Sequence, residues 1–134
     1  MEGNQPVRRA GDFEAWLAFF FEWVRQTAEG AVSTAQRLTA LFREDRERIV
    51  PRGRRAGSGL RVHDALKARP LTSVQELCAR TGLSFPAAAS ALELLVELGI
   101  ARELTGKRRN RVFAYDRYVA ILNEGTEHPS ERTR

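Results

Sequence analysis

The stretch SVQELCARTGLSFPAAASALELLVELG, residues 73–99, decides the fold that the sequence predicts. Ser73 and Glu76 have the S-x-x-E spacing of a capping box, so a helix is expected to begin there and to end at Gly82. Ser84 is placed to cap a longer helix, over about 85–98, which Gly99 stops. Two capped helices joined by a short turn that contains glycine are typical of a helix-turn-helix.

The flanking residues extend this motif to a winged helix. Residues 101–115, ARELTGKRRNRVFAY, alternate at both ends around a polar, basic centre, which predicts a β-hairpin. On the other side, an apolar pattern predicts a helix over 59–69, which Pro70 ends. With a last short helix from Asp116, the predicted domain covers 59–125. The polar residues 126–134 are expected to be a disordered tail.

Residues 1–50 are predicted to form a separate helical hairpin. Asp12 is expected to cap a helix over 13–29, Gly30 to interrupt it, and a second helix to run over 31–50. The second helix has an apolar stripe that one residue, Asp45, breaks.

The stretch PRGRRAGSG, residues 51–59, holds three Arg, three Gly and one Pro, and 51–58 is therefore assigned as a linker. The predicted fold class is mainly α. It consists of an N-terminal helical hairpin and a winged helix-turn-helix domain with a small β-hairpin wing.

The run AWLAFFFEWV, residues 15–24, holds two tryptophans and three consecutive phenylalanines. It is too short to span a bilayer, which needs about 20 apolar residues. Its apolar arc covers roughly 200° of the helix, twice the arc of an ordinary surface helix. Such a patch is expected to be an association surface, and the alternative is an intramolecular core. We expect a homodimer or a larger assembly whose contact includes Phe13, Trp16, Phe20 and Trp23.

The formal net charge is +5, and residues 51–118 hold 13 of the 22 basic side chains but only 6 of the 17 acidic ones. A basic region points to an anionic partner. The single cysteine, Cys78, permits no internal disulfide, which fits the cytoplasm. Cys78 is expected to be buried, and His63 has no other ligand near it in sequence. No catalytic constellation, metal site or cofactor motif can be assembled, so we expect a protein that is not an enzyme.

The hairpin tip GKRRNR, residues 106–111, is the strongest functional signal. Four cations within five residues repel each other, and such clusters displace counterions from DNA. The alternative is a solvated tip without function. A smaller contribution is expected from residues of the helix-turn-helix. The predicted DNA-binding residues are Lys107, Arg108, Arg109, Asn110 and Arg111, with Arg80, Ser84 and Ser90.

The second helix of the helix-turn-helix favours low sequence specificity. No basic residue occurs from Ser84 to Val96, whereas recognition helices usually present basic or amide side chains to base edges. Its expected outward residues are Phe85, Pro86, Ala87, Ser90 and Ala91, followed by Glu93 and Glu97. An apolar outer face is equally consistent with a protein-interaction module.

Two stretches resemble the C-terminal part of Fic-family proteins. Residues 7–31 (VRRAGDFEAWLAFFFEWVRQTAEGA), running on to 40–49 (ALFREDRERI), resemble the helices that follow the family's catalytic motif. Residues 70–125 resemble the winged-helix domain at the C-terminus of many members.

The resemblance implies AMP transfer by a catalytic domain whose signature is HPFxxGNGRxxR, and this chain does not contain that motif. It also implies that the aromatic helix packs against that catalytic core. The chain is therefore expected to be a non-catalytic portion that binds DNA. The alternative is a protein-interaction or dimerisation module that positions partners for a Fic-type catalytic domain.

Overall fold

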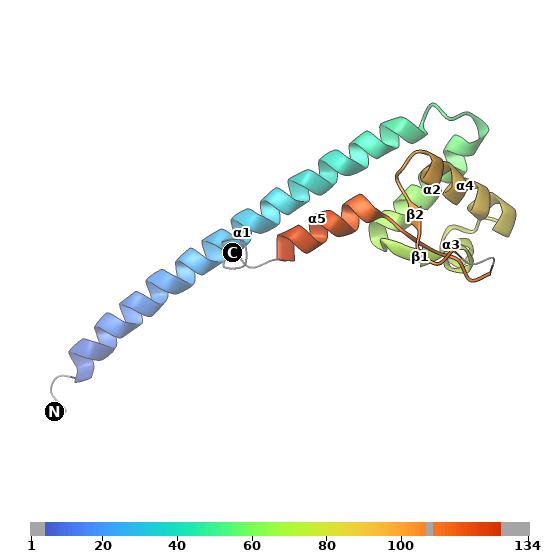
Figure 1. The fold of residues 1–134 in the computed structure, drawn as a ribbon. Helices are drawn as coiled ribbons and strands as arrows, with labels where there is room; N and C mark the ends of the chain where they lie inside the picture. Colours follow the sequence, from blue (N-terminus) through green and yellow to red (C-terminus); the bar gives the residue numbers. More distant parts are fainter. Residues whose placement is uncertain (1–4, 107–108, 127–134) are drawn as a thin grey trace. The chain divides into compact units, whose positions relative to one another are not determined.

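A computed structural model of the protein describes residues 5–106 and 109–126. These residues are mainly helical and include a small three-stranded antiparallel sheet (Figure 1). A boundary between two compact units lies inside the first helix, after Ala35. In order, the elements are α1 (Gln5–Ile49), α2 (Arg54–Ala68), β1 (Leu71–Ser73), α3 (Val74–Thr81), α4 (Phe85–Glu97), β2 (Arg102–Glu103), β3 (Val112–Ala114) and α5 (Asp116–Thr126).

The predicted helical hairpin is wrong, because α1 is one continuous helix of 45 residues. Gly30 does not interrupt it, since a glycine inside a helix costs only about 1 kcal/mol relative to alanine. Ion pairs one turn apart support the helix just before this glycine. Arg25 lies 2.5 Å from a carboxylate oxygen of Glu22 and 2.8 Å from one of Glu29.

Two further boundaries differ from the prediction. Asp12 lies inside α1 and is not its N-cap. Residues 54–58, predicted as linker, are the first turns of α2, so only residues 50–53 separate the two helices. Gly53 has a φ of 68°, which favours glycine in this tight turn.

One glycine that suggested a linker is in fact a packing residue. Gly59 is buried in α2, and a Cβ atom added there would lie 3.1 Å from Cγ2 of Ile49 and 3.2 Å from Cδ2 of Leu94. Only a residue without a side chain lets α2 approach these two neighbours so closely. Tertiary packing therefore overrides the local signal for a linker.

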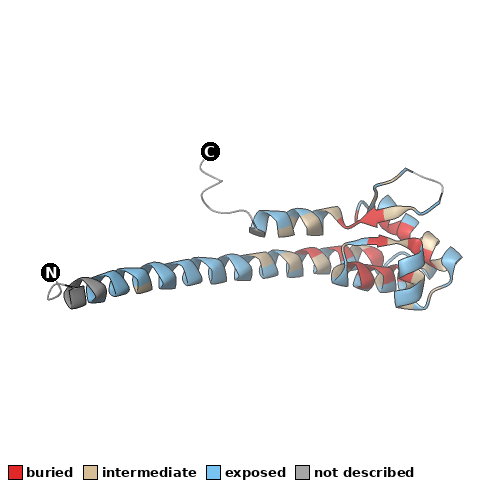
Figure 2. Ribbon diagram, turned by 90° about the horizontal axis from the view of Figure 1, so that it is seen from below, coloured by how far each residue is buried: buried red, intermediate tan, exposed pale blue. Residues whose placement is uncertain are grey.

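The buried residues gather in the second unit, residues 36–134, as Figure 2 shows. Helices α2, α3 and α4 pack against one another there. Along α4 the buried stripe is Ala88, Ala91, Leu92 and Leu95, with the helical spacing of three and four residues. Ala91, predicted to face outward, is therefore buried, whereas Val96 is 40% exposed.

The predicted caps of α3 and α4 are confirmed. The Ser73 hydroxyl accepts the N–H of Glu76 at 3.2 Å, and the Ser84 hydroxyl accepts the N–H of Ala87 at 3.3 Å. Gly82, which follows α3, has a φ of 74°.

The predicted hairpin of residues 101–115 is confirmed by the antiparallel pairing of β2 with β3, in which Glu103 lies opposite Phe113. The sheet has a third strand that the sequence did not predict. In β1, Ser73 pairs with Val112, so that β3 is the central strand. A strand of three residues that follows Pro70 and ends on the helix cap Ser73 is too short to show a period of two.

No helix within the described residues is long and apolar enough to cross a membrane. The predicted tail, residues 126–134, lies outside the described residues from 127 onward.

Candidate nucleic-acid interface

The hairpin tip carries one described cation that is open to an anionic ligand. Arg109 and Asn110 are exposed, and Arg109 makes no ion pair with any described residue. Asn110 has a φ of 56°, a left-handed conformation that asparagine tolerates in tight turns. Lys107 and Arg108 lie outside the described residues.

The predicted role of Arg111 in DNA binding stays a prediction, and its charge is already paired within the hairpin. Its guanidinium donates two hydrogen bonds to Glu103, both of 2.8 Å, and its carbon lies 5.1 Å from the centre of the Phe113 ring. These hydrogen bonds lower the pKa of Glu103 below its usual range. Glu103 sits directly opposite Phe113 across the β2–β3 pair, so the sheet register places it beside Arg111. Arg111 therefore links the two strands of the hairpin through Glu103. The tip then carries less unpaired positive charge than the count of its cations suggests.

The outer side of α4 is acidic near the hairpin. A hollow of about 240 Å³ is lined by Val96, Arg111 and Phe113 and by three glutamates, Glu93, Glu97 and Glu103. Glu97 also lies 3.0 Å from Arg55 at the start of α2. Arg55 and Arg111 are each paired with one of these glutamates, and the third glutamate adds a negative charge. This face therefore repels phosphate groups.

The three other predicted DNA contacts are not gathered at the tip. The Ser84 hydroxyl caps α4, and Ser90 is half-buried on the same helix. Arg80 is exposed but lines a different hollow, together with Arg61 and Thr81. Of the predicted DNA contacts that the structure describes, Arg109, Asn110 and Arg111 are therefore the ones that lie at the tip.

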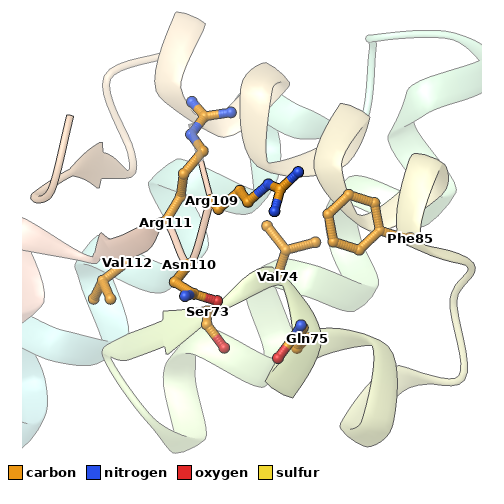
Figure 3. A pocket seen from close by; sticks show the side chains of 8 residues that line it. All are labelled: Ser73, Val74, Gln75, Phe85, Arg109, Asn110, Arg111 and Val112. Carbon is orange, nitrogen blue, oxygen red and sulfur yellow. The ribbon is translucent and has the colours of Figure 1, made fainter. Parts of the chain in front are cut away.

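A pocket of about 370 Å³ lies beside this tip (Figure 3). The close view shows Arg109 extending toward the ring of Phe85, while Arg111 extends toward the top of the view. Three segments form the pocket: the β1–α3 junction, the first residue of α4, and the chain that leads from the tip into β3. Its lining residues are Ser73, Val74, Gln75, Phe85, Arg109, Asn110, Arg111 and Val112.

The aromatic run in the first unit is exposed. Trp16 stacks on Phe20 with ring centres 5.3 Å apart, yet 55% of Trp16 and 41% of Phe20 remain accessible. Phe13 and Trp23 continue the row on either side. Phe19, turned away from this row, is 72% exposed. The predicted association residues therefore share one surface of α1. No other described residue of the first unit packs over this surface.

A buried polar cluster is the feature that the sequence reasoning missed. Tyr115 donates a hydrogen bond to Oδ2 of Asp45, and Nε2 of His63 lies 3.1 Å from the Tyr115 hydroxyl. All three side chains are almost fully buried. The Tyr115 hydroxyl donates its one proton to Asp45, so its oxygen can only accept a hydrogen bond from His63. His63 therefore carries a proton on Nε2 and donates it to the tyrosine oxygen. Asp45 was the signal, because a carboxylate that interrupts an apolar stripe needs partners if it is buried.

Ion pairs complete the cluster around Asp45. Its other oxygen, Oδ1, has no hydrogen-bond partner among the described residues but lies 3.6 Å from Arg48 and 3.9 Å from Arg117. Burial raises the pKa of Tyr115 far above its usual range, and the hydrogen bond to Asp45 adds to this effect. The cluster ties α1 to α2 and to the chain after β3, and it is a structural element of the second unit.

No group of three or more potential metal-ligating side chains occurs within the described ranges. Cys78, expected to be buried, is only half-buried and packs against the core. Comparison of the sequence with models of protein families finds no match, and comparison with curated proteins finds no relative. The function is therefore argued from the geometry.

Proposed function

We propose that residues 54–126 form a winged helix that binds the DNA backbone through its hairpin tip, in the cytoplasm. The order α2–β1–α3–α4–β2–β3 supports a winged helix, because a strand precedes the helix-turn-helix and a hairpin follows it. The observation that carries the proposal is the exposed Arg109, which has no ion pair in the described part of the chain. Two further cations, Lys107 and Arg108, precede it in sequence.

Binding through phosphate contacts implies low sequence specificity. Base readout would need donors on α4, and its exposed side chains near the hairpin are Glu93, Val96 and Glu97. The affinity would then come from charge neutralisation at the tip and would fall steeply with salt.

Self-association through Phe13, Trp16, Phe20 and Trp23 would strengthen such weak binding. Two tips on one duplex act at a high effective concentration, so a dimer binds more tightly than one tip does. The resemblance to the C-terminal part of Fic proteins offers another partner for the aromatic run, a Fic-type catalytic core.

A fluorescence-anisotropy titration with random duplex DNA at about 50 mM salt tests the proposal. The wild type is expected to bind, and the variant Lys107→Ala/Arg108→Ala/Arg109→Ala is expected to lose binding. Arg43→Ala, which removes an exposed cation of α1 outside the predicted contacts, is the matched control and should bind as the wild type does. No binding by the wild type, or equal binding by the tip variant, would refute the proposal.

A second candidate function is recognition of a protein. The specific observation is the hollow between α4 and the hairpin, whose three glutamates and exposed Val96 suit a partner with basic and apolar side chains. The exposed ring of Phe85 extends this face. If this function is correct, Glu93→Lys and Phe85→Glu abolish partner binding and leave the charge of the tip intact. If DNA binding is the function, Glu93→Lys strengthens it.

A further inference from the structure

The pocket beside the hairpin tip has an apolar wall that DNA phosphate contacts would not use. Phe85 is 57% exposed although it is a large ring at the mouth of a cavity. Val74, from the start of α3, and Val112, from β3, supply the other apolar side chains (Figure 3). A concave site of about 370 Å³ with such a wall falls in the size range of small-molecule pockets.

The charge of the pocket is positive and is concentrated on one side chain. No carboxylate occurs among the lining residues that the structure describes. Arg111 is paired with Glu103, and its guanidinium lies apart from that of Arg109 in Figure 3. Within the described part of the chain, Arg109 therefore supplies the only lining charge that is not already paired, and its guanidinium extends toward the Phe85 ring.

Polar groups complete the lining without adding charge. Ser73, Gln75 and Asn110 supply a hydroxyl and two amides. The Ser73 hydroxyl already accepts the N–H of Glu76, whereas amides both donate and accept hydrogen bonds. These groups suit the polar edge of a flat ligand.

We propose that this pocket binds a planar aromatic ring that carries one anionic group. The ring stacks against Phe85, the anion takes the guanidinium hydrogen bonds of Arg109, and Asn110 or Gln75 contacts the ring edge. Two sources share this chemistry, a free aromatic carboxylate and an unpaired nucleotide. The inference does not depend on binding of duplex DNA.

Amide chemical shifts of the isotope-labelled full chain, followed during titration, test the inference with three probes. These are 2-naphthoate, its uncharged analogue 2-naphthylmethanol, and thymidine 5′-monophosphate. Naphthoate is expected to shift the amides of residues 73–75, 85 and 109–112, and the neutral analogue is expected to bind about tenfold more weakly or worse. Stronger binding of the nucleotide than of naphthoate would assign the site to an unpaired nucleotide, and the reverse order to a small carboxylate.

Two variants separate the pocket from general attraction of anions. Arg109→Gln should weaken binding of the anionic probes about tenfold or more, while Arg80→Gln should leave it unchanged. Both side chains are exposed, so both variants are expected to keep the wild-type melting temperature. The inference is overturned if neither anion shifts these amides, if the shifts fall on the aromatic run 13–24, or if Arg109→Gln binds as tightly as the wild type.

Discussion

The cluster of Asp45, His63 and Tyr115 shows how single residues determine the design of the second unit. A buried carboxylate is costly unless hydrogen bonds and opposite charges compensate it. Here Tyr115 supplies the hydrogen bond, and Arg48 and Arg117 supply charge from the surface. The sequence indicated Asp45 as an interruption of an apolar stripe, but its partners lie 18 and 70 positions further along the chain. Only the tertiary structure brings them together.

His63 is predicted to make the stability of the protein depend on pH. Burial lowers the pKa of His63 below 6.5, and the charge of Lys67 adds to this effect, while Asp45 and Asp64 oppose it. Arg46 also lowers it. The unfolded chain then takes up a proton at a higher pH than the folded chain does. The stabilisation is complete above about pH 6.5 and is lost as the pH falls below that value.

Thermal or urea denaturation between about pH 7.5 and 5.5 measures this effect, in a range where ordinary carboxylates do not titrate. The free energy of unfolding of the wild type is expected to fall by up to about 1.4 kcal/mol per pH unit at the steepest point. His63→Gln keeps an N–H donor for Tyr115 but does not titrate, so its pH profile should be flatter. Parallel profiles for the two proteins would contradict this account.

At the scale of elements, two glycines of α2 are predicted to behave in opposite ways. Gly57 is exposed and an added Cβ atom would meet nothing, so Gly57→Ala should stabilise the protein by up to about 1 kcal/mol through helix propensity. Gly59 faces Ile49 and Leu94, which are fully buried and cannot yield easily. Gly59→Ala should therefore be less stable than Gly57→Ala by about 1–3 kcal/mol. Urea denaturation of both variants checks the prediction, and equal stability would show that α2 has room to shift.

The elements that carry short-range signals could be predicted from the sequence. Ser73, Ser84 and Gly82 fix α3 and the start of α4 through local hydrogen bonds and backbone conformation, and the hairpin has its own turn residues. The long helix α1 could not be predicted in full, because Gly30 suggests a break that the structure does not contain. Likewise the ion pair of Arg111 with Glu103 depends on the register of β2 and β3. The sequence shows how many cations the tip contains, but the strand register decides that Arg111 is paired and does not remain available to a ligand.

At the scale of the whole molecule, the first unit contains the exposed aromatic row and the second unit contains the hydrophobic core. The aromatic row of α1 leaves more than a third of each of its four rings exposed, which is unusual for tryptophan and phenylalanine. An arc of roughly 200° also exceeds what one ordinary helix contact covers. Association is the simplest way to remove this area from water.

Sedimentation velocity measures the predicted association. The wild type is expected to sediment as a species of at least twice the chain mass of 15.1 kDa, and Trp16→Glu/Phe20→Glu as the single chain. Val50→Glu replaces an exposed valine of the second unit and is the matched control. A wild-type protein that remains a single chain at micromolar concentration would contradict the prediction.

The salt dependence of duplex binding tests the central claim, phosphate contact through the hairpin tip, most directly. Each phosphate neutralised adds about 0.9 to the slope of log K against log salt concentration. The account predicts that Arg109→Gln lowers the magnitude of this slope by about 0.9, while Arg43→Gln leaves it unchanged. An unchanged slope for Arg109→Gln, or an equal decrease for Arg43→Gln, would show that the tip does not make the contact.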